Sequence, residues 1–140
     1  MRYAIVVGRF YEDLAERLVS SATRVFEEAG ADGVDVFDVP GAYELPFAAQ
    51  ELARTGRYAG VACLGAVIRG ETSHYDHVCE ESARGIMDVS LRSGVPCSFG
   101  VLTVDTMEQA IARSGGGKRD SGAHAAEAVL SLVALRQAVA

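Results

Sequence analysis

The chain alternates between short continuous apolar runs and longer stretches in which apolar residues recur every three or four positions. The continuous runs predict buried β-strands at residues 3–7, 34–39, 60–68 and 97–102. The helical spacing predicts α-helices at residues 14–29, 46–55, 73–91, 107–113 and 123–139. Strands that alternate with helices predict an α/β fold, a flavodoxin-like three-layer sandwich with a central four-stranded parallel sheet.

Two of the predicted helices indicate which side chains face the core. The helix at 73–91 is predicted to bury one stripe, formed by Tyr75, Val78, Ser82, Ala83, Ile86 and Met87. The last helix, which follows a predicted loop at 115–122, is predicted to turn inward Ala126, Val129, Leu130 and Val133. No linker, repeat or low-complexity tract interrupts the pattern, so one domain is expected over residues 1–140.

Sheets of this kind bind ligands beyond the carboxyl ends of their strands. Four segments are predicted to lie at that edge, namely residues 8–11, 40–44, 69–74 and 103–106. Three of the 15 glycines fall in these segments, where backbone bends sharply or approaches a ligand. The fold class therefore predicts where a site lies, but not its chemistry.

Composition narrows the classes of function. The 140 residues include 13 basic and 19 acidic side chains, and the net charge of −6 argues against binding of nucleic acid or of an anionic membrane. No apolar run is long enough for a membrane span, and Met1-Arg2-Tyr3 begins no secretion signal, so a cytoplasmic protein is expected. The three cysteines show no paired spacing, so neither a disulfide framework nor a metal site is expected.

The segment 69–74 is the richest in candidate chemistry. It leaves the predicted central strand and opens a helix, whose free N–H groups favour an anion such as phosphate. The alternative is a helix start that is capped by Thr72 or Ser73 with nothing bound. His74 is the best candidate for proton transfer, and its alternative is a structural hydrogen bond. His77 and His124 have no comparable context and are expected at the surface.

The basic segment at residues 113–119 and Phe10 each have a functional and a structural interpretation. Arg113, Lys118 and Arg119 flank a run of glycines, but the spacing of a nucleotide P-loop is absent. This segment is either a basic loop for a smaller phosphate or a solvated charge cluster. Phe10, just beyond the first strand, either stacks on a planar ring or packs over the following helix. The residues alone thus predict a site for a small phosphorylated ligand that contains a ring.

Taken together, these segments resemble the 6,7-dimethyl-8-ribityllumazine synthase family of riboflavin biosynthesis. Four stretches match, followed by the Ala-rich last helix: IVVGRFY (5–11), VPGAYELPFAA (39–49), LGAVIRGETSHYDHVC (64–79) and FGVLTVDTMEQAIARS (99–114). Each stretch is weakly specific alone, but they follow in the family's order and spacing over nearly the whole chain.

The resemblance implies a transferase that condenses 5-amino-6-(D-ribitylamino)uracil with 3,4-dihydroxy-2-butanone 4-phosphate, without metal or organic cofactor. It implies that the pyrimidine and its ribityl chain contact Phe10, Gly41, Ala42, Tyr43, Glu44, Val67, Ile68 and Phe99. By the same resemblance the phosphate contacts Gly70, Glu71, Thr72 and Arg113, and His74 is the catalytic residue that shuttles protons. Phe99 and Arg113 are expected to come from a neighbouring subunit.

The resemblance also implies a homo-oligomer. Family members form pentamers, many of which build hollow shells of sixty subunits, and riboflavin synthase is the expected partner protein. This chain has Ser121 where the family carries a second lysine, which leaves the phosphate contacts of Lys118 and Arg119 open. Tyr11 and Tyr43 replace a frequent asparagine and phenylalanine. Two alternatives share these motifs: a flavin- or lumazine-binding paralogue without activity, and an archaeal-type riboflavin synthase.

Overall fold

The computed structural model describes residues 1–115 and 119–140, and these form a four-stranded parallel sheet in the order β2-β1-β3-β4. The strands are β1 (Arg2–Gly8), β2 (Gly33–Val39), β3 (Gly60–Ile68) and β4 (Cys97–Val104). All three strand pairs are parallel and in continuous register. The α/β fold predicted from the alternating pattern is confirmed.

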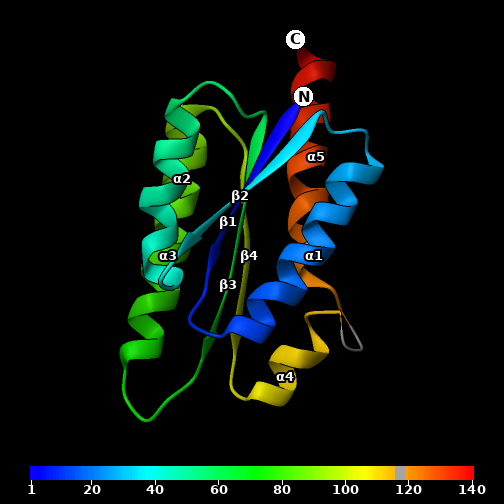
Figure 1. The fold of residues 1–140 in the computed structure, drawn as a ribbon. Helices are drawn as coiled ribbons and strands as arrows, with labels where there is room; N and C mark the ends of the chain where they lie inside the picture. Colours follow the sequence, from blue (N-terminus) through cyan, green and yellow to red (C-terminus); the bar gives the residue numbers. More distant parts are fainter. Residues whose placement is uncertain (116–118) are drawn as a thin grey trace.

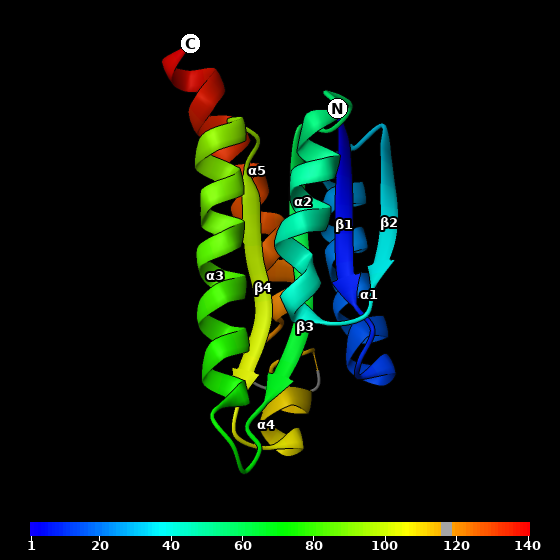
Figure 2. The same cartoon turned by 90° about the vertical axis from the view of Figure 1, so that its left-hand side faces the viewer.

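Helices cover both faces of the sheet, which gives the predicted three layers (Figure 1). One face carries α1 (Glu12–Glu28), α4 (Met107–Ala112) and α5 (Ser121–Val139). The other carries the short 3₁₀ helix η1 (Ala42–Glu44), α2 (Leu45–Arg54) and α3 (His74–Ser93). Figure 2 shows the second face, with α2 and α3 side by side in front of the strands.

The two inner strands are buried on both faces, so their side chains divide between two cores. On the α1 and α5 face, Ile5 and Val7 pack with Leu18 and Phe26, and Phe26 stacks on Tyr3 with ring centroids 4.6 Å apart. On the α2 and α3 face, the packed side chains include Ala4, Val6, Val61, Cys63, Leu45 and Ile86. The continuous apolar runs therefore reflect strands that have helices on both sides.

The predicted inward stripe of α3 is wrong at two positions. Ala83 and Met87 are exposed, whereas the buried ridge runs through Val78, Ser82, Ile86 and Val89. A step of one residue turns a helix by about 100°. Each misassigned side chain follows a buried one directly and so points away from the sheet.

The last helix begins two residues earlier than predicted. Its start at Ser121 follows from the Asp120 carboxylate, which accepts a hydrogen bond from the Ala123 N–H at 3.1 Å and caps the helix. The predicted loop at 115–122 is shorter for the same reason, and its residues 116–118, including Lys118, lie outside the described residues. The inward positions Ala126 and Val129 are fully buried, as predicted.

Among the described residues, no helix combines the length and the apolar character that a membrane crossing requires. Several large apolar side chains are nevertheless exposed on the outer surface of α2 and α3, namely Phe47, Met87 and Leu91. Met87 and Leu91 lie about one turn apart on α3, and neighbouring exposed apolar side chains are typical of a surface that contacts another protein.

The contact between α5 and α1 gives a first testable prediction. A Cβ atom on Gly122 would overlap the backbone carbonyl oxygen of Leu18, so Gly122→Ala must push the two helices apart. We expect the variant to lose about 1–3 kcal/mol of stability, although alanine is by about 1 kcal/mol the better helix former. Thermal unfolding followed by circular dichroism measures this loss. Gly70→Ala is the control, because nothing lies within 4 Å of the added atom; equal unfolding temperatures of the two variants would contradict the prediction.

Candidate functional site

The four predicted segments meet at the carboxyl edge of the sheet, at the lower end of the strands in Figure 2. The Arg9 N–H donates to the Val39 carbonyl at 2.9 Å, and the Arg69 N–H donates to the Val104 carbonyl at 2.9 Å. These backbone bonds continue the pairing beyond the inner strands. They join segments 8–11 and 40–44 on one side, and segments 69–74 and 103–106 on the other.

The segment 40–44 is held close to the end of β1. A Cβ atom on Gly8 would lie 2.9 Å from the carbonyl carbon of Gly41, so both backbones approach more closely than a side chain allows. The Gly41 N–H donates to a carboxylate oxygen of Glu44 at 2.9 Å, which closes the turn into η1. Ala42 points into the core, whereas Tyr43 is 61% exposed.

Phe10 lies beside this segment with 74% of its surface exposed, and it meets the Tyr11 ring edge-on at 4.8 Å. The structure therefore leaves most of the ring uncovered. The preceding Arg9 is tied down on both sides: its Nε donates to Asp38 at 2.8 Å and its Nη1 to Glu16. The backbone that carries Phe10 is thus anchored while the ring itself remains accessible for stacking.

The segment 70–73 is exposed and leads into α3, whose first helical residue is His74. The Thr72 hydroxyl accepts a hydrogen bond from the His74 N–H at 3.3 Å, whereas the N-cap residue Ser73 makes no side-chain cap hydrogen bond. His74, Glu71 and Thr72 are all exposed. His77 is also exposed, as is His124 on α5, as predicted for both.

Val67 and Ile68 end β3 directly before this segment. Val67 is buried against the α2 and α3 core, and Ile68 is partly buried on the α1 and α5 face. The first turn of α3 is anchored by Tyr75, which packs against the same core as Val67. Burial raises the pKa of the Tyr75 phenol above its ordinary value of 10.0, so this side chain stays neutral near neutral pH.

Phe99 and Arg113 do not lie with these residues in one chain. Phe99 is five residues before the end of β4, about 16 Å along the strand, and is 41% exposed. Arg113 follows α4 on the opposite face of the sheet from α3, and its guanidinium donates to the Gln109 carbonyl at 3.2 Å (Figure 1). The chain alone thus assembles the other predicted residues at one edge without these two.

Comparison with known proteins decides the family. The sequence profile described as 6,7-dimethyl-8-ribityllumazine synthase matches residues 1–137. A protein of that name from Salinibacter ruber is 50% identical over 136 residues, which cover 96% of this chain and 87% of the relative. The chain belongs to the 6,7-dimethyl-8-ribityllumazine synthase family.

Two further relatives carry the same name. One from Ruthia magnifica is 42% identical over 99% of this chain and 87% of its own length. The chloroplastic protein of Spinacia oleracea is 46% identical over 96% of this chain and 61% of its own length. The family resemblance predicted from the four motifs is confirmed by these matches.

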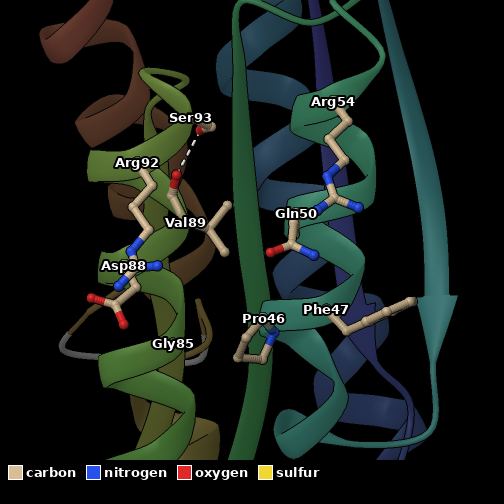
Figure 3. Close-up of a pocket in the computed structure, with 9 residues that line it drawn as sticks. All are labelled: Pro46, Phe47, Gln50, Arg54, Gly85, Asp88, Val89, Arg92 and Ser93. Carbon is tan, nitrogen blue, oxygen red and sulfur yellow. Dashed lines mark hydrogen bonds between the residues drawn. The ribbon is translucent and has the colours of Figure 1, made fainter.

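Two hollows of this lumazine synthase family member are lined by residues other than the predicted ligand contacts. One of about 590 Å³ runs between α2 and α3 (Figure 3) and is lined by Pro46, Phe47, Gln50, Arg54, Gly85, Asp88, Val89, Arg92 and Ser93. The other, of about 400 Å³, lies between the start of α1 and α4 and is lined by Tyr11, Glu12, Asp13, Leu14, Arg17, Met107 and Ile111. The second hollow includes Tyr11, which directly follows Phe10, but no residue that the sequence assigned to a ligand lines either of these two hollows.

Sequence reasoning assigned no role to the two arginines at this edge, Arg9 and Arg69. Arg9 directly follows β1 and binds Asp38 in β2. Arg69 directly follows β3 and binds Asp105, the first residue after β4. The sequence does contain a signal for these two ion pairs: an arginine follows each inner strand, and an aspartate lies near the end of each outer strand. Which arginine pairs with which aspartate required the strand order.

The cysteines yield a second testable prediction. Burial raises the pKa of Cys97 to about 12 and raises that of Cys63 well above its ordinary 9.0, while Cys79 is only partly buried. Because the thiolate is the reactive form, we expect an aromatic disulfide reagent at pH 8 to modify at most one thiol per folded chain and all three after unfolding. Cys79→Ser should abolish the reaction of the folded protein. Rapid modification of two or more thiols before unfolding would contradict this.

The same pKa shifts fix a pH dependence of stability. The folded state favours the protonated thiols of Cys63 and Cys97, whereas the unfolded chain ionises them near pH 9. Their contribution is therefore complete below about pH 8.5 and is lost as the pH rises through 9 toward 12. Thermal unfolding between pH 8 and 10.5 should show a smaller decline for Cys97→Ala, relative to its own value at pH 8, than for the unmodified chain.

Proposed function

We propose that this chain condenses 5-amino-6-(D-ribitylamino)uracil with 3,4-dihydroxy-2-butanone 4-phosphate to give 6,7-dimethyl-8-ribityllumazine, phosphate and water. It is then a transferase of riboflavin biosynthesis. The observation that carries this proposal is the family match over residues 1–137, with relatives named for that product. The arrangement of the motifs at one sheet edge supports it.

The pyrimidine substrate is proposed to bind on the β1 side of the edge. The uncovered Phe10 ring offers a stacking surface, and aromatic rings stack on planar ligands in an offset arrangement. Close to it, the turn from Gly41 through Ala42 and Tyr43 presents backbone groups and the Glu44 carboxylate to the ribityl hydroxyls. Val67 and Ile68 at the end of β3 are proposed to contact the ring.

The phosphate of the second substrate is proposed to bind on the β3 side. Gly70, Glu71 and Thr72 precede α3, a helix of 20 residues whose N-terminal N–H groups and dipole attract an anion. Gly70 is open around its Cα, which lets a ligand approach the backbone. Arg113 of a neighbouring subunit supplies the charge-assisted hydrogen bonds that hold the phosphate and stabilise it as it leaves.

His74 is proposed to move the protons between these two halves. Imine formation, phosphate elimination and ring closure each require a proton transfer near neutral pH, which imidazole performs well. His74 lies at the start of α3, exposed toward solvent and next to the proposed phosphate segment. Holding both substrates in position contributes up to about 7–11 kcal/mol in the best cases, and no metal or organic cofactor enters the proposal.

The active unit is proposed to be a pentamer, and mass measurement by light scattering distinguishes a free pentamer from a sixty-subunit shell. Two observations support subunit contacts: the open edge lacks Phe99 and Arg113 of the same chain, and apolar side chains are exposed on α2 and α3. Adjacent copies in a ring meet through two different surfaces, so each site can combine residues of two subunits. Riboflavin synthase, which uses the product, is the proposed partner protein, and the cytoplasm is the proposed location.

One assay tests the reaction. The purified protein is mixed with both substrates, and lumazine formation is followed by absorbance and fluorescence against the spontaneous background. A rate well above background supports the proposal, and no acceleration would refute it in favour of a lumazine- or flavin-binding paralogue. Riboflavin formation from added lumazine would instead indicate an archaeal-type riboflavin synthase.

The role of Arg113 gives a fourth prediction. Arg113→Ala removes charge-assisted hydrogen bonds, each worth about 1.5–3 kcal/mol, so the KM for the butanone phosphate should rise on the order of 10- to 100-fold. The KM for the pyrimidine should stay within about twofold, because that substrate is held by other residues. Arg57→Ala is the matched control, because Arg57 is an exposed arginine that precedes β3 at the opposite edge of the sheet. Equal rises for both substrates would contradict the assignment.

Sharing of the site between subunits gives a fifth prediction. At a butanone phosphate concentration far below the raised KM of Arg113→Ala, both His74→Ala and Arg113→Ala are expected to be nearly inactive. Co-expression should give mixed pentamers in which some sites combine an intact His74 with an intact Arg113. With random mixing in a ring, about one quarter of the sites are of that kind, so about one quarter of the activity should return. Mixed oligomers are isolated by two affinity tags. Recovery of no activity in such oligomers would place both residues in the same chain's site.

A further inference from the structure

Arg69 is the first residue after β3 and makes four contacts that the proposed reaction does not explain. Its backbone N–H donates to the Val104 carbonyl at 2.9 Å, and its Nε donates to Asp105 Oδ1 at 2.8 Å. Its guanidinium carbon lies 4.2 Å from the centroid of the Tyr75 ring. Its Nη1 is 3.7 Å from Asp76 Oδ1. One side chain thus contacts the end of β4 and the first turn of α3.

These contacts bracket the proposed phosphate segment. Residues 70–73 form an exposed connection between Arg69 and His74, and nothing lies within 4 Å of a Cβ built on Gly70. Such a connection does little by itself to fix the helix that follows. The Arg69 guanidinium reaches across it to Tyr75, the residue directly after His74. The position of the α3 start therefore depends on this contact together with the packing of Tyr75 against the core.

The geometry uses properties specific to arginine. A planar guanidinium can stack on an aromatic face while its edge binds a carboxylate, which an ammonium group cannot do. The Tyr75 ring is a firm surface for this contact because it packs against the core formed by β3, α2 and α3. Asp105 is held in turn, since its backbone N–H donates to the Gln109 side chain at 2.7 Å. An isolated surface ion pair contributes little, but here one group has three partners on two elements.

We infer that Arg69 is a positioning residue: together with Asp105 and Tyr75 it fixes the first turn of α3, so that His74 meets the reacting atoms. The inference rests on the proposed function of His74. It assigns Arg69 no contact with either substrate, which separates it from the alternative that its half-exposed guanidinium binds the substrate phosphate directly.

The expected effect follows from this distinction. A misplacement of about 1 Å at a reacting group costs on the order of 100-fold in rate. Arg69→Met keeps much of the aliphatic stem but loses the stacking, the charge and the hydrogen bonds. We expect its kcat to fall between about 10- and 100-fold. The KM for the pyrimidine should stay within about twofold, because Phe10 and residues 41–44 are held by separate contacts.

Two related variants and a control sharpen the comparison. Arg69→Lys keeps the charge without the planar stacking and should lie between the wild type and Arg69→Met. Asp105→Asn keeps the shape and loses the charged partner, so it should lower kcat in the same direction. Arg57→Met is the matched control, because Arg57 also lies over a tyrosine ring, Tyr58 at 5.7 Å, but precedes β3 at the opposite edge of the sheet. It should leave kcat unchanged.

A double-mutant cycle with His74→Ala decides the inference. If Arg69 acts through His74, Arg69→Met should cost less than about twofold once His74 is absent, since interacting residues give non-additive losses. Losses that multiply in the double variant, an unchanged kcat in Arg69→Met, or an equal loss in Arg57→Met would each overturn the inference. A rise confined to the KM for the butanone phosphate would assign Arg69 to phosphate binding instead.

Two possible failures are kept apart. Light scattering and circular dichroism show whether each variant folds and assembles like the wild type; if Arg69→Met does not, the same cycle is run with Arg69→Lys and Asp105→Asn. Absence of lumazine formation by the wild-type protein would refute the proposed function itself. Normal wild-type activity with an additive cycle would refute only the role of Arg69.

Discussion

The parallel pairing of the four strands is the constraint on which the rest of this structure depends. Because all strands run in one direction, their carboxyl ends meet at one edge of the sheet, and every segment that leaves a strand there faces the same region. The pairing does not stop at the last strand residue. The N–H groups of Arg9 and Arg69 extend it to the outer strands, and their side chains reach Asp38 and Asp105, both at 2.8 Å.

These two arginines divide the edge into two halves with related construction. Arg9 precedes Phe10 and ties β1 to β2, whereas Arg69 precedes the phosphate segment and ties β3 to β4. The first half is made compact by the close approach of Gly8 and Gly41, the second by the stacking of Arg69 on Tyr75. In each half, the residue proposed to contact ligand is exposed while its backbone neighbour is anchored. A reaction that joins two substrates requires this combination of access and fixed geometry.

Much of this arrangement could be predicted from the sequence, for physical reasons that also mark where prediction failed. A strand with helices on both sides must be apolar throughout, so the positions of β1 and β3 could be predicted from their continuous apolar runs. The ends of these runs predicted which segments lie at the carboxyl edge of the sheet. Helical periodicity could not separate the core stripe of α3 from its neighbours, because Ala83, Met87 and Leu91 form a second apolar stripe, at a spacing of four residues, on the exposed side. The start of α5 depends on one carboxylate cap, at Asp120, inside a glycine-rich stretch. The pairing of Arg9 with Asp38 and of Arg69 with Asp105 depends on the order of the strands in the sheet, which no local sequence pattern contains.

The exposed apolar side chains of α2 and α3 have the same explanation in the proposed assembly as the absence of Phe99 and Arg113 from the carboxyl edge of the sheet. Phe47, Met87 and Leu91 are exposed in the single chain, and burial of each such side chain contributes about 1.5–3 kcal/mol. A subunit contact that covers these side chains supplies the free energy that holds a neighbour in place. In the proposed pentamer a neighbour also brings Phe99 and Arg113 to the edge, since within one chain they lie elsewhere. Stability of the oligomer and completion of the site are then coupled. A substitution on the exposed side of α3, away from any ligand, should therefore lower the reaction rate by weakening assembly.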